Sequence, residues 1–263
     1  MAANAEPPAT APSGVSNVVV FLHGIGGSAR AWTLQDAYFE VAGFAPVALD
    51  LPGYGARPPV ETMEFEALAA DVEASIAEHG LASPVLVGHS MGGMIVQTLL
   101  RRRPDAYRAA VQVCTSPAFG NPAGDFQRQF VAGRLEPLDA GRTMAELAPA
   151  MVDGMMGPKP DETAKAFATA LMAATPASTY RAAVRCLVGF DERANLAAIK
   201  VPVLCLAAEH DRNAPPAMIE RMASKIAGAR YVCLPGAGHL PNLEAPAAFD
   251  RAVLNFLAGL DGG

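Results

Sequence analysis

The chain has 263 residues, of which 51% are hydrophobic and 17% charged, and its formal net charge is −6. This length and composition are typical of a globular protein with a sizeable core, and they exclude a mainly disordered chain. The acidic balance gives no basis for binding nucleic acid or an anionic membrane surface, and no apolar run reaches the ~18 residues of a membrane span. We therefore expect neither nucleic acid nor membrane as a partner.

The first 16 residues are rich in Ala, Pro and Ser, and they lack both the basic and the apolar segment of a secretory signal. They are predicted to form a disordered tail. The four cysteines are far apart in sequence and form no CxxC pair: Cys114, Cys186, Cys205 and Cys233. We expect no metal site and no disulfide among them, which favours a reducing, cytoplasmic location.

Six short apolar runs alternate with longer helical patterns along the chain. The runs are apolar throughout, as is typical of strands buried on both faces of a parallel sheet. They cover residues 18–22, 46–51, 85–87, 110–114, 201–207 and 231–234. The helical patterns cover about 29–41, 64–79, 91–103, 216–226 and 246–257. This alternation predicts an α/β architecture with right-handed crossovers.

Residues 116–196 interrupt the alternation, because they contain no convincing buried strand. A structureless loop of that length is uncommon in a compact domain, so we predict a helical insert over one edge of the sheet. The core would then consist of residues 17–115 and 197–263. Five of the 11 methionines lie in the insert: Met144, Met151, Met155, Met156 and Met172. They fit either the core of a helical layer or a pliable apolar roof over a pocket.

A run of three arginines, residues 101–103, ends one helical pattern just before Pro104. Cations at the end of a helix complement the negative end of its dipole. We favour this structural interpretation over a basic binding patch.

Ser90 lies in the pattern Gly88-x-Ser90-x-Gly92, between an apolar run and a helical pattern. A serine nucleophile must project from the carboxyl end of its strand, and the sharp turn that achieves this leaves room only for Gly two residues before and after. The helix that follows directs free N–H groups toward a developing oxyanion. The pattern alone is weak evidence, and its strand–turn–helix context strengthens it.

A serine nucleophile needs a base, and the chain has only five histidines: His23, His79, His89, His210 and His239. His239 follows the last predicted strand in a Gly-rich loop that can reach the carboxyl edge of the sheet, so it is the candidate base. His79 is explained by helix capping and His23 by hydrogen bonding within its loop. We expect the His89 side chain to point away from Ser90, and His210 to lie in a surface loop.

The base in turn needs a carboxylate, for which Asp211 is the candidate because it follows the strand predicted at 201–207. Glu209, two residues earlier, is the alternative. Asp50 is on the same edge but belongs to a turn, and Glu244 is expected to tie down the loop of the candidate base. An oxyanion also needs N–H donors, and the sequence "HGIGGS" at residues 23–28 offers a loop whose glycines allow close approach. Alternatively, these glycines only build a turn.

These segments together resemble the signature segments of the α/β-hydrolase superfamily: "FLHGIGGSARAW", "DLPGYG", "LVGHSMGG", "CLAAEHD" and "PGAGHLPNLEAP". The order Ser, Asp, His agrees with that fold. The resemblance covers about residues 18–257 and implies a mostly parallel sheet of six to eight strands flanked by helices, with a helical cap after the sixth strand of the fold. It implies Ser90 as nucleophile, His239 as base and Asp211 as orienting acid, with the backbone N–H groups of Ile25 and Met91 as oxyanion hole. Family members usually open with a β-hairpin, but no strand pattern precedes Val18, so six strands are expected.

Within the superfamily, "GHSMGGMIVQ" and residues 191–196 are similar to the 3-oxoadipate enol-lactonase group and its carboxylesterase relatives. This similarity implies a serine hydrolase that cleaves a small carboxylic ester or enol-lactone, with a small-molecule substrate and with no cofactor or metal. Two alternatives stay open: a C–C bond hydrolase of a ring-cleavage product that uses the same triad, and a non-catalytic ligand receptor. The oligomeric state is left open. Five arginines of the insert could either bind a substrate carboxylate or lie on solvated helix faces: Arg128, Arg134, Arg142, Arg181 and Arg185.

Overall fold

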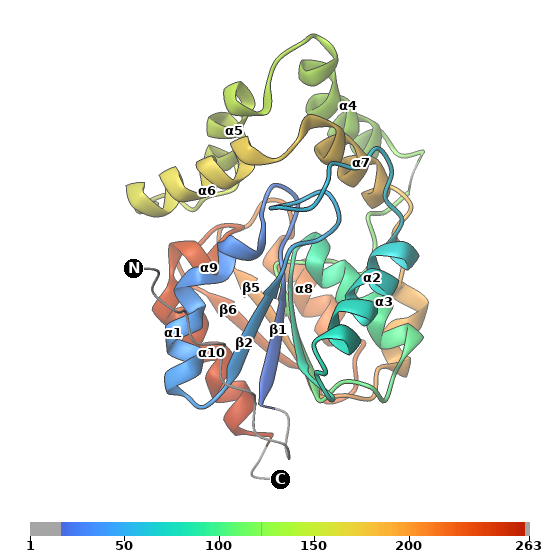
Figure 1. Cartoon of the computed structure of the whole chain (residues 1–263), viewed down its shortest axis with the longest axis vertical. Helices are drawn as coiled ribbons and strands as arrows, with labels where there is room; N and C mark the ends of the chain where they lie inside the picture. Colours follow the sequence, from blue (N-terminus) through green and yellow to red (C-terminus); the bar gives the residue numbers. More distant parts are fainter. Residues whose placement is uncertain (1–16, 122, 261–263) are drawn as a thin grey trace, which may run out of the picture.

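The computed structural model describes residues 17–121 and 123–260, so the tail predicted at residues 1–16 lies outside the described residues. Six parallel strands form one sheet in the order β2-β1-β3-β4-β5-β6 (Figure 1). Their bounds are β1 Val18–Leu22, β2 Ala45–Leu49, β3 Val85–His89, β4 Ala109–Val113, β5 Val203–Ala208 and β6 Arg230–Leu234. Each of the six predicted strands is present, with ends that differ by at most two residues.

The four inner strands are buried at every position, as their apolar sequences predict. The two edge strands are not: β2 is half-buried throughout, and β6 exposes Arg230 and Cys233. The run at 231–234 was expected to be buried on both faces, and that expectation is wrong at Cys233 because β6 is an edge strand with a neighbour on only one side. All four cysteines are free in the structure.

Helices cover both faces of the sheet. The helices η1 (Ala29–Trp32), α1 (Thr33–Val41) and α10 (Pro246–Ala258) pack on one face, and α2 (Phe65–Glu78), α3 (Met91–Arg102) and α8 (Pro216–Ala223) on the other (Figure 1). Alternate residues of a strand point to opposite faces, so Val19 and Phe21 of β1 join one core cluster and Val20 and Leu22 the other. This explains why the inner strands are apolar at consecutive positions.

In the described residues, four α-helices follow β4 and precede β5: α4 (Asp125–Asp139), α5 (Met144–Asp153), α6 (Glu162–Ala174) and α7 (Ala177–Leu187). We call these helices the cap. They lie in the interval where a helical insert is predicted, and they cover the carboxyl end of the sheet (Figure 1). A short helix, η2 (Arg193–Ala198), leads back to β5.

Local sequence starts two of the cap helices. At α5, the Thr143 hydroxyl accepts the N–H of Glu146 at 3.3 Å, and the Glu146 carboxylate accepts the N–H of Thr143 at 2.7 Å. At α6, the Asp161 carboxylate accepts the N–H of Ala164 at 2.9 Å. Each of these N-terminal side chains satisfies backbone N–H groups that have no acceptor within the helix.

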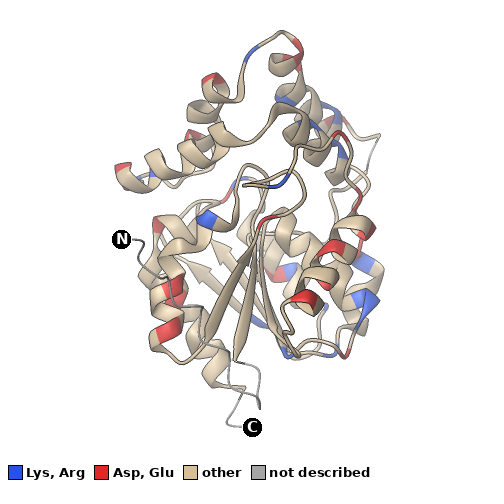
Figure 2. Ribbon diagram, viewed as in Figure 1, with Lys and Arg blue, Asp and Glu red and all other residues tan. Residues whose placement is uncertain are grey.

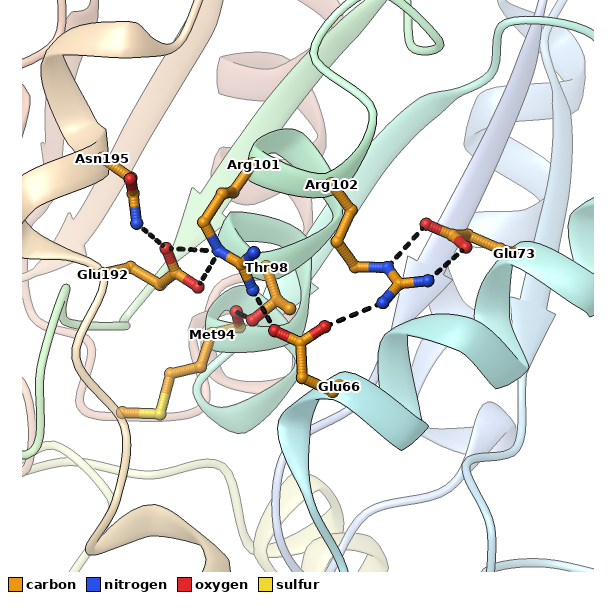
Figure 3. A network of polar contacts seen from close by, with 8 residues as sticks. All are labelled: Glu66, Glu73, Met94, Thr98, Arg101, Arg102, Glu192 and Asn195. Atoms are coloured by element: carbon orange, nitrogen blue, oxygen red, sulfur yellow. Dashed lines mark hydrogen bonds and ion pairs between the residues drawn. The ribbon is translucent and has the colours of Figure 1, made fainter.

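Arg101 and Arg102 at the end of α3 take part in an ion-pair network (Figure 3). The Arg101 guanidinium lies 2.9 Å from the Glu192 carboxylate and also pairs with Glu66. Arg102 lies 2.9 Å from Glu73 and 2.7 Å from Glu66. The network joins α3 to α2 and to the chain just before η2. The helix-dipole interpretation was therefore incomplete, because the acidic partners come from segments far away in sequence.

The strands are almost free of charged residues, which lie mainly on helices and loops (Figure 2). Among residues 17–121 and 123–260, no helix is both long and apolar enough to cross a membrane.

Candidate active site

Ser90 lies in a strained turn between β3 and α3. Its backbone has φ 53° and ψ −116°, a conformation that is unfavourable for a residue with a side chain. The Ser90 N–H donates to the Val113 carbonyl at 2.9 Å, and the Thr115 hydroxyl donates to the Ser90 carbonyl at 2.7 Å. The end of β4 and the Thr115 side chain that follows it therefore hold the turn in place.

The two glycines of the Gly-x-Ser-x-Gly pattern are required by close backbone contacts. A Cβ at Gly88 would lie 2.5 Å from the Gly92 carbonyl oxygen, and a Cβ at Gly92 would lie 2.3 Å from the Leu22 carbonyl oxygen. The obstructing atoms are backbone atoms of the turn and of β1, so they cannot rotate away as a side chain could. The structure therefore confirms the prediction that the turn leaves room only for glycine at these two positions.

We expect Gly92→Ala to lower the free energy of unfolding by about 3 kcal/mol or more, because β1 or α3 must shift to admit the methyl group. Denaturant unfolding measures this change. The matched control is Gly189→Ala, where an added Cβ meets nothing within 4 Å. Equal losses in the two variants would contradict the steric argument.

Ser90, His239 and Asp211 form one chain of hydrogen bonds. The Ser90 hydroxyl lies 3.1 Å from His239 Nε2, and His239 Nδ1 lies 2.8 Å from Asp211 Oδ2. If the imidazole carries its proton on Nδ1, it donates to the carboxylate and Nε2 accepts from the hydroxyl. These residues follow β3, β6 and β5, so the structure brings together the three predicted side chains from separate strand ends.

The environment of Asp211 favours its ionised form. Burial alone raises the pKa of this carboxyl, but His239 and the N–H groups of Asn213 and Ala214 outweigh it, so the pKa is lowered. These two N–H groups donate to Oδ1 at 2.8 and 3.0 Å. Asp211 as a whole is 3% exposed, and its second carboxylate oxygen, Oδ2, is the one that contacts the imidazole.

Glu244 holds the loop of His239, which confirms the role expected for it. Its carboxylate accepts the N–H groups of Gly238 at 3.1 Å and Leu240 at 3.0 Å, on either side of the histidine. It also accepts the N–H of Gly157 at 2.7 Å, in the turn between α5 and α6. One carboxylate therefore ties both the histidine loop and the cap to the same point.

The backbone of His239 has two further partners. Its N–H donates to the Met155 carbonyl at 2.6 Å, and its carbonyl lies 2.7 Å from His89 Nε2, which donates to it. Burial, reinforced by His239, lowers the pKa of His89 to about 3, so this imidazole is neutral. His89 therefore supports the loop of the candidate base. The sequence predicted only that its side chain avoids Ser90, because a loop 150 positions away in sequence gives no local signal.

The other histidines have structural roles. His23 Nδ1 bonds the Gly24 carbonyl at 2.8 Å, and its Nε2 accepts the Leu51 N–H at 3.2 Å, which confirms the predicted loop role. Burial lowers the pKa of His23 to about 4. His79 bonds the carbonyl of the preceding helical turn at 2.7 Å, and His210 is exposed, as predicted for each.

The alternative acids do not contact His239. The Glu209 carboxylate accepts the Gly236 N–H at 2.8 Å and is exposed. Asp50 accepts the Ala29 N–H at 2.7 Å and so holds the start of η1, which agrees with a structural role.

The two predicted oxyanion donors lie on segments that adjoin Ser90. Met91 is the first residue of α3, so its N–H has no acceptor within the helix. Ile25 lines the same cavity as Ser90. A Cβ at Gly24 would lie 3.0 Å from the Ser90 Cβ, so the loop after β1 packs directly against the serine.

A cavity of about 430 Å³ opens above Ser90 and His239, and this volume is in the range of sites for small molecules. Its walls come from the sheet edge and from α4, α5, α6 and α7. Apolar side chains dominate the lining, among them Phe119, Phe130, Leu147, Met151, Met155 and Met172. Met144 and Met156 lie instead in the core of the cap, and Met172 belongs to both sets. Both interpretations of the methionines therefore hold, for different residues.

Four of the five cap arginines lie away from this cavity. Arg128 pairs with Asp125 and Arg181 with Asp139. Arg142 donates to a backbone carbonyl, and Arg185 lines a separate hollow. Only Arg134 lines the cavity above the serine.

One group of potential metal ligands is found among the described residues. Ligand atoms of Cys114, Asp211 and His239 lie within 4.8 Å of one another. Burial, followed by the charge of Asp211, raises the pKa of the Cys114 thiol well above its usual range, so the thiol keeps its proton. Asp211 and His239 are bonded to each other. This group therefore does not have the properties of a preformed metal site.

Comparisons with known proteins agree on one family. A model described as "Alpha/beta hydrolase family" matches residues 19–252. "Putative non-heme bromoperoxidase BpoC" of Mycobacterium tuberculosis is 29% identical over 257 residues, which cover 94% of this chain and 96% of that protein. A pimeloyl-[acyl-carrier protein] methyl ester esterase of Neisseria meningitidis is 28% identical and covers 92% of this chain and 77% of that protein. The crystal structure of the enol-lactonase from Burkholderia xenovorans LB400 is 26% identical, covers 93% of this chain and 92% of that one, and has a TM-score of 0.83.

Proposed function

Since this chain belongs to the alpha/beta hydrolase family, we propose that it is a serine hydrolase that cleaves a small carboxylic ester or lactone through an acyl-enzyme on Ser90. The observation that carries the proposal is the continuous hydrogen-bond chain from Ser90 through His239 to Asp211, at the floor of the cavity. Such a chain is the arrangement that converts a weakly nucleophilic hydroxyl into a nucleophile.

In the first half of the reaction, the Ser90 oxygen attacks the carbonyl carbon while His239 Nε2 takes its proton. Asp211 holds the imidazole in the tautomer that leaves Nε2 free, and its charge stabilises the imidazolium. The tetrahedral oxyanion would accept hydrogen bonds from the N–H groups of Ile25 and Met91. The second of these also lies at the positive end of the α3 dipole.

Collapse of this intermediate breaks the bond to the leaving alkoxide, which receives the proton from His239. In the second half, His239 takes a proton from water, whose oxygen attacks the acyl carbon. The second tetrahedral intermediate then breaks its bond to the Ser90 oxygen and releases the acid, while His239 returns the proton to Ser90. In a lactone, the leaving alkoxide stays attached to the acyl group, so one hydroxy acid is released.

We expect steady hydrolysis of p-nitrophenyl butyrate, and a butyryl group on Ser90 in samples that are acid-quenched during turnover. Peptide mass spectrometry locates the acyl group. Hydrolysis without an acyl group at Ser90 would overturn the covalent mechanism. Binding without turnover would favour the receptor alternative, whereas turnover of ring-cleavage products alone would favour C–C bond hydrolysis.

A further inference from the structure

Arg134 of α4 places a positive charge at the cavity above Ser90. It is half-buried, and the other cap arginines lie elsewhere. No Asp, Glu or Lys is found among the described residues that line this cavity, so Arg134 brings its only permanent charge. Ser90 reaches the cavity from the sheet and Arg134 from the cap, with mainly apolar side chains between them.

The contacts of Arg134 leave its charge without an acidic partner. Its guanidinium carbon lies 3.4 Å from the centroid of the Phe130 ring, and Nη1 lies 3.4 Å from the Phe130 carbonyl oxygen. Burial lowers the pKa of Arg134, while interactions with Tyr180, including a hydrogen bond, oppose that change. Among the described residues no carboxylate forms an ion pair with it, in contrast to Arg128 and Arg181.

A partly buried cation that lacks a counter-ion loses hydration without full compensation, and such residues gather at functional sites. The planar guanidinium can donate two parallel hydrogen bonds to a carboxylate, and stacking on Phe130 holds the plane of the group. One positive charge also matches one carboxylate, whereas a phosphate dianion would leave an uncompensated negative charge in an otherwise apolar cavity.

We propose that Arg134 is the specificity residue of this site and binds a carboxylate of the substrate, so that the preferred substrates are anionic esters or lactones. This inference rests on the proposed function of Ser90. The substrate would carry its carboxylate and its scissile carbonyl at opposite ends of an apolar spacer, with the carboxylate at α4 and the carbonyl at the serine.

The test compares two esters that differ only in charge: the mono-p-nitrophenyl ester of adipic acid and the same compound with its free carboxylate capped as a methyl ester. Wild-type protein should show the higher kcat/KM for the anionic ester. Arg134→Met should lower kcat/KM for that ester roughly 10- to 100-fold, mainly through KM, and leave the capped ester unchanged within a factor of about two. Arg134→Lys should recover part of the loss. Arg181→Met, another half-buried cap arginine, should change neither.

A binding measurement separates this inference from the proposed function. Calorimetry should detect binding of monomethyl adipate, which carries one carboxylate, to Ser90→Ala protein, and the added change Arg134→Met should weaken it. If Arg134 only packs the cap, Arg134→Met lowers kcat/KM for both esters equally, and the inference is overturned. Absence of both a charge preference and monomethyl adipate binding also overturns it, while ester turnover would leave the proposed function standing. If neither ester is turned over but monomethyl adipate binds through Arg134, the subsite stands and the proposed function fails.

Discussion

Ser90→Ala is expected to lower kcat for ester hydrolysis by about 10⁴- to 10⁶-fold, because it removes the atom that forms the acyl-enzyme. The hydrogen bond between His239 and Asp211 and the cavity lining do not depend on the serine hydroxyl, so substrate should still bind. Residual activity should reflect oxyanion stabilisation and positioning alone. Initial rates with p-nitrophenyl butyrate determine the factor. They are measured at an enzyme concentration high enough for the enzymatic rate to exceed the rate of spontaneous hydrolysis.

The control for this substitution is Ser224→Ala, an exposed serine just after α8 whose hydroxyl donates to a local carbonyl at 2.8 Å. It should keep wild-type activity. Far-ultraviolet circular dichroism of Ser90→Ala should match wild type, since a methyl group replaces a hydroxymethyl group at an already strained backbone. A fully active and correctly folded Ser90→Ala protein would rule out the serine mechanism.

The fold could be predicted from the sequence because the patterns that indicate its strands and helices are local. Apolar runs such as 18–22 and 85–87 are long enough for strands, and their lack of alternation predicts burial on both faces. The family match confirms the α/β-hydrolase resemblance that the motifs suggested, and the described sheet has six strands. Burial of the run 231–234 was predicted wrongly at Cys233 because strand order, which decides which strands lie at the edges, is not encoded within any single strand.

The triad candidates were also accessible, for a topological reason. Parallel strands present their carboxyl ends at one edge, so Ser90, Asp211 and His239 could be placed together from their positions after predicted strands. Interactions that join distant loops could not be placed in this way. The bond from His89 to the His239 carbonyl depends on how the loop after β6 lies against the end of β3, and the bond from Glu244 to Gly157 depends on how the cap meets that loop.

The orientation of side chains in the cap was even less predictable from the sequence. Five arginines were equal candidates for a substrate contact from sequence alone, because the sequence does not show which of them pair with acidic side chains in the folded protein. Acidic side chains on neighbouring turns or helices, Asp125 and Asp139, neutralise two of them, and α4 packs so that Arg134 lines the cavity. Helix packing, not local sequence, therefore decides which charge faces the cavity.

Asp211→Asn is expected to lower kcat by about 10⁴-fold while leaving the fold intact. The N–H groups of Asn213 and Ala214 already donate to Oδ1, so the amide oxygen of Asn would take that position and its NH₂ group would face His239 Nδ1. An NH₂ group is a donor, so the imidazole would have to accept through Nδ1 and carry its proton on Nε2. In that tautomer His239 cannot take the Ser90 proton. Glu209→Gln, which changes the rejected alternative acid, should retain activity within about twofold, and an equal loss in both variants would contradict the assignment.

The same substitution tests the lowered pKa of Asp211. A carboxyl whose pKa is depressed by folding contributes stability above its unfolded pKa of 3.8, and this contribution is lost as pH falls through the lower folded pKa. Wild-type protein should therefore be more stable than Asp211→Asn at neutral pH, and the difference should shrink progressively below about pH 4. Denaturant unfolding of both proteins between pH 3 and 7 measures the difference. If the difference in unfolding free energy stays constant over this range, His239 and the two N–H groups do not hold Asp211 in its ionised form. The electrostatic argument for its role in orienting His239 would then be wrong.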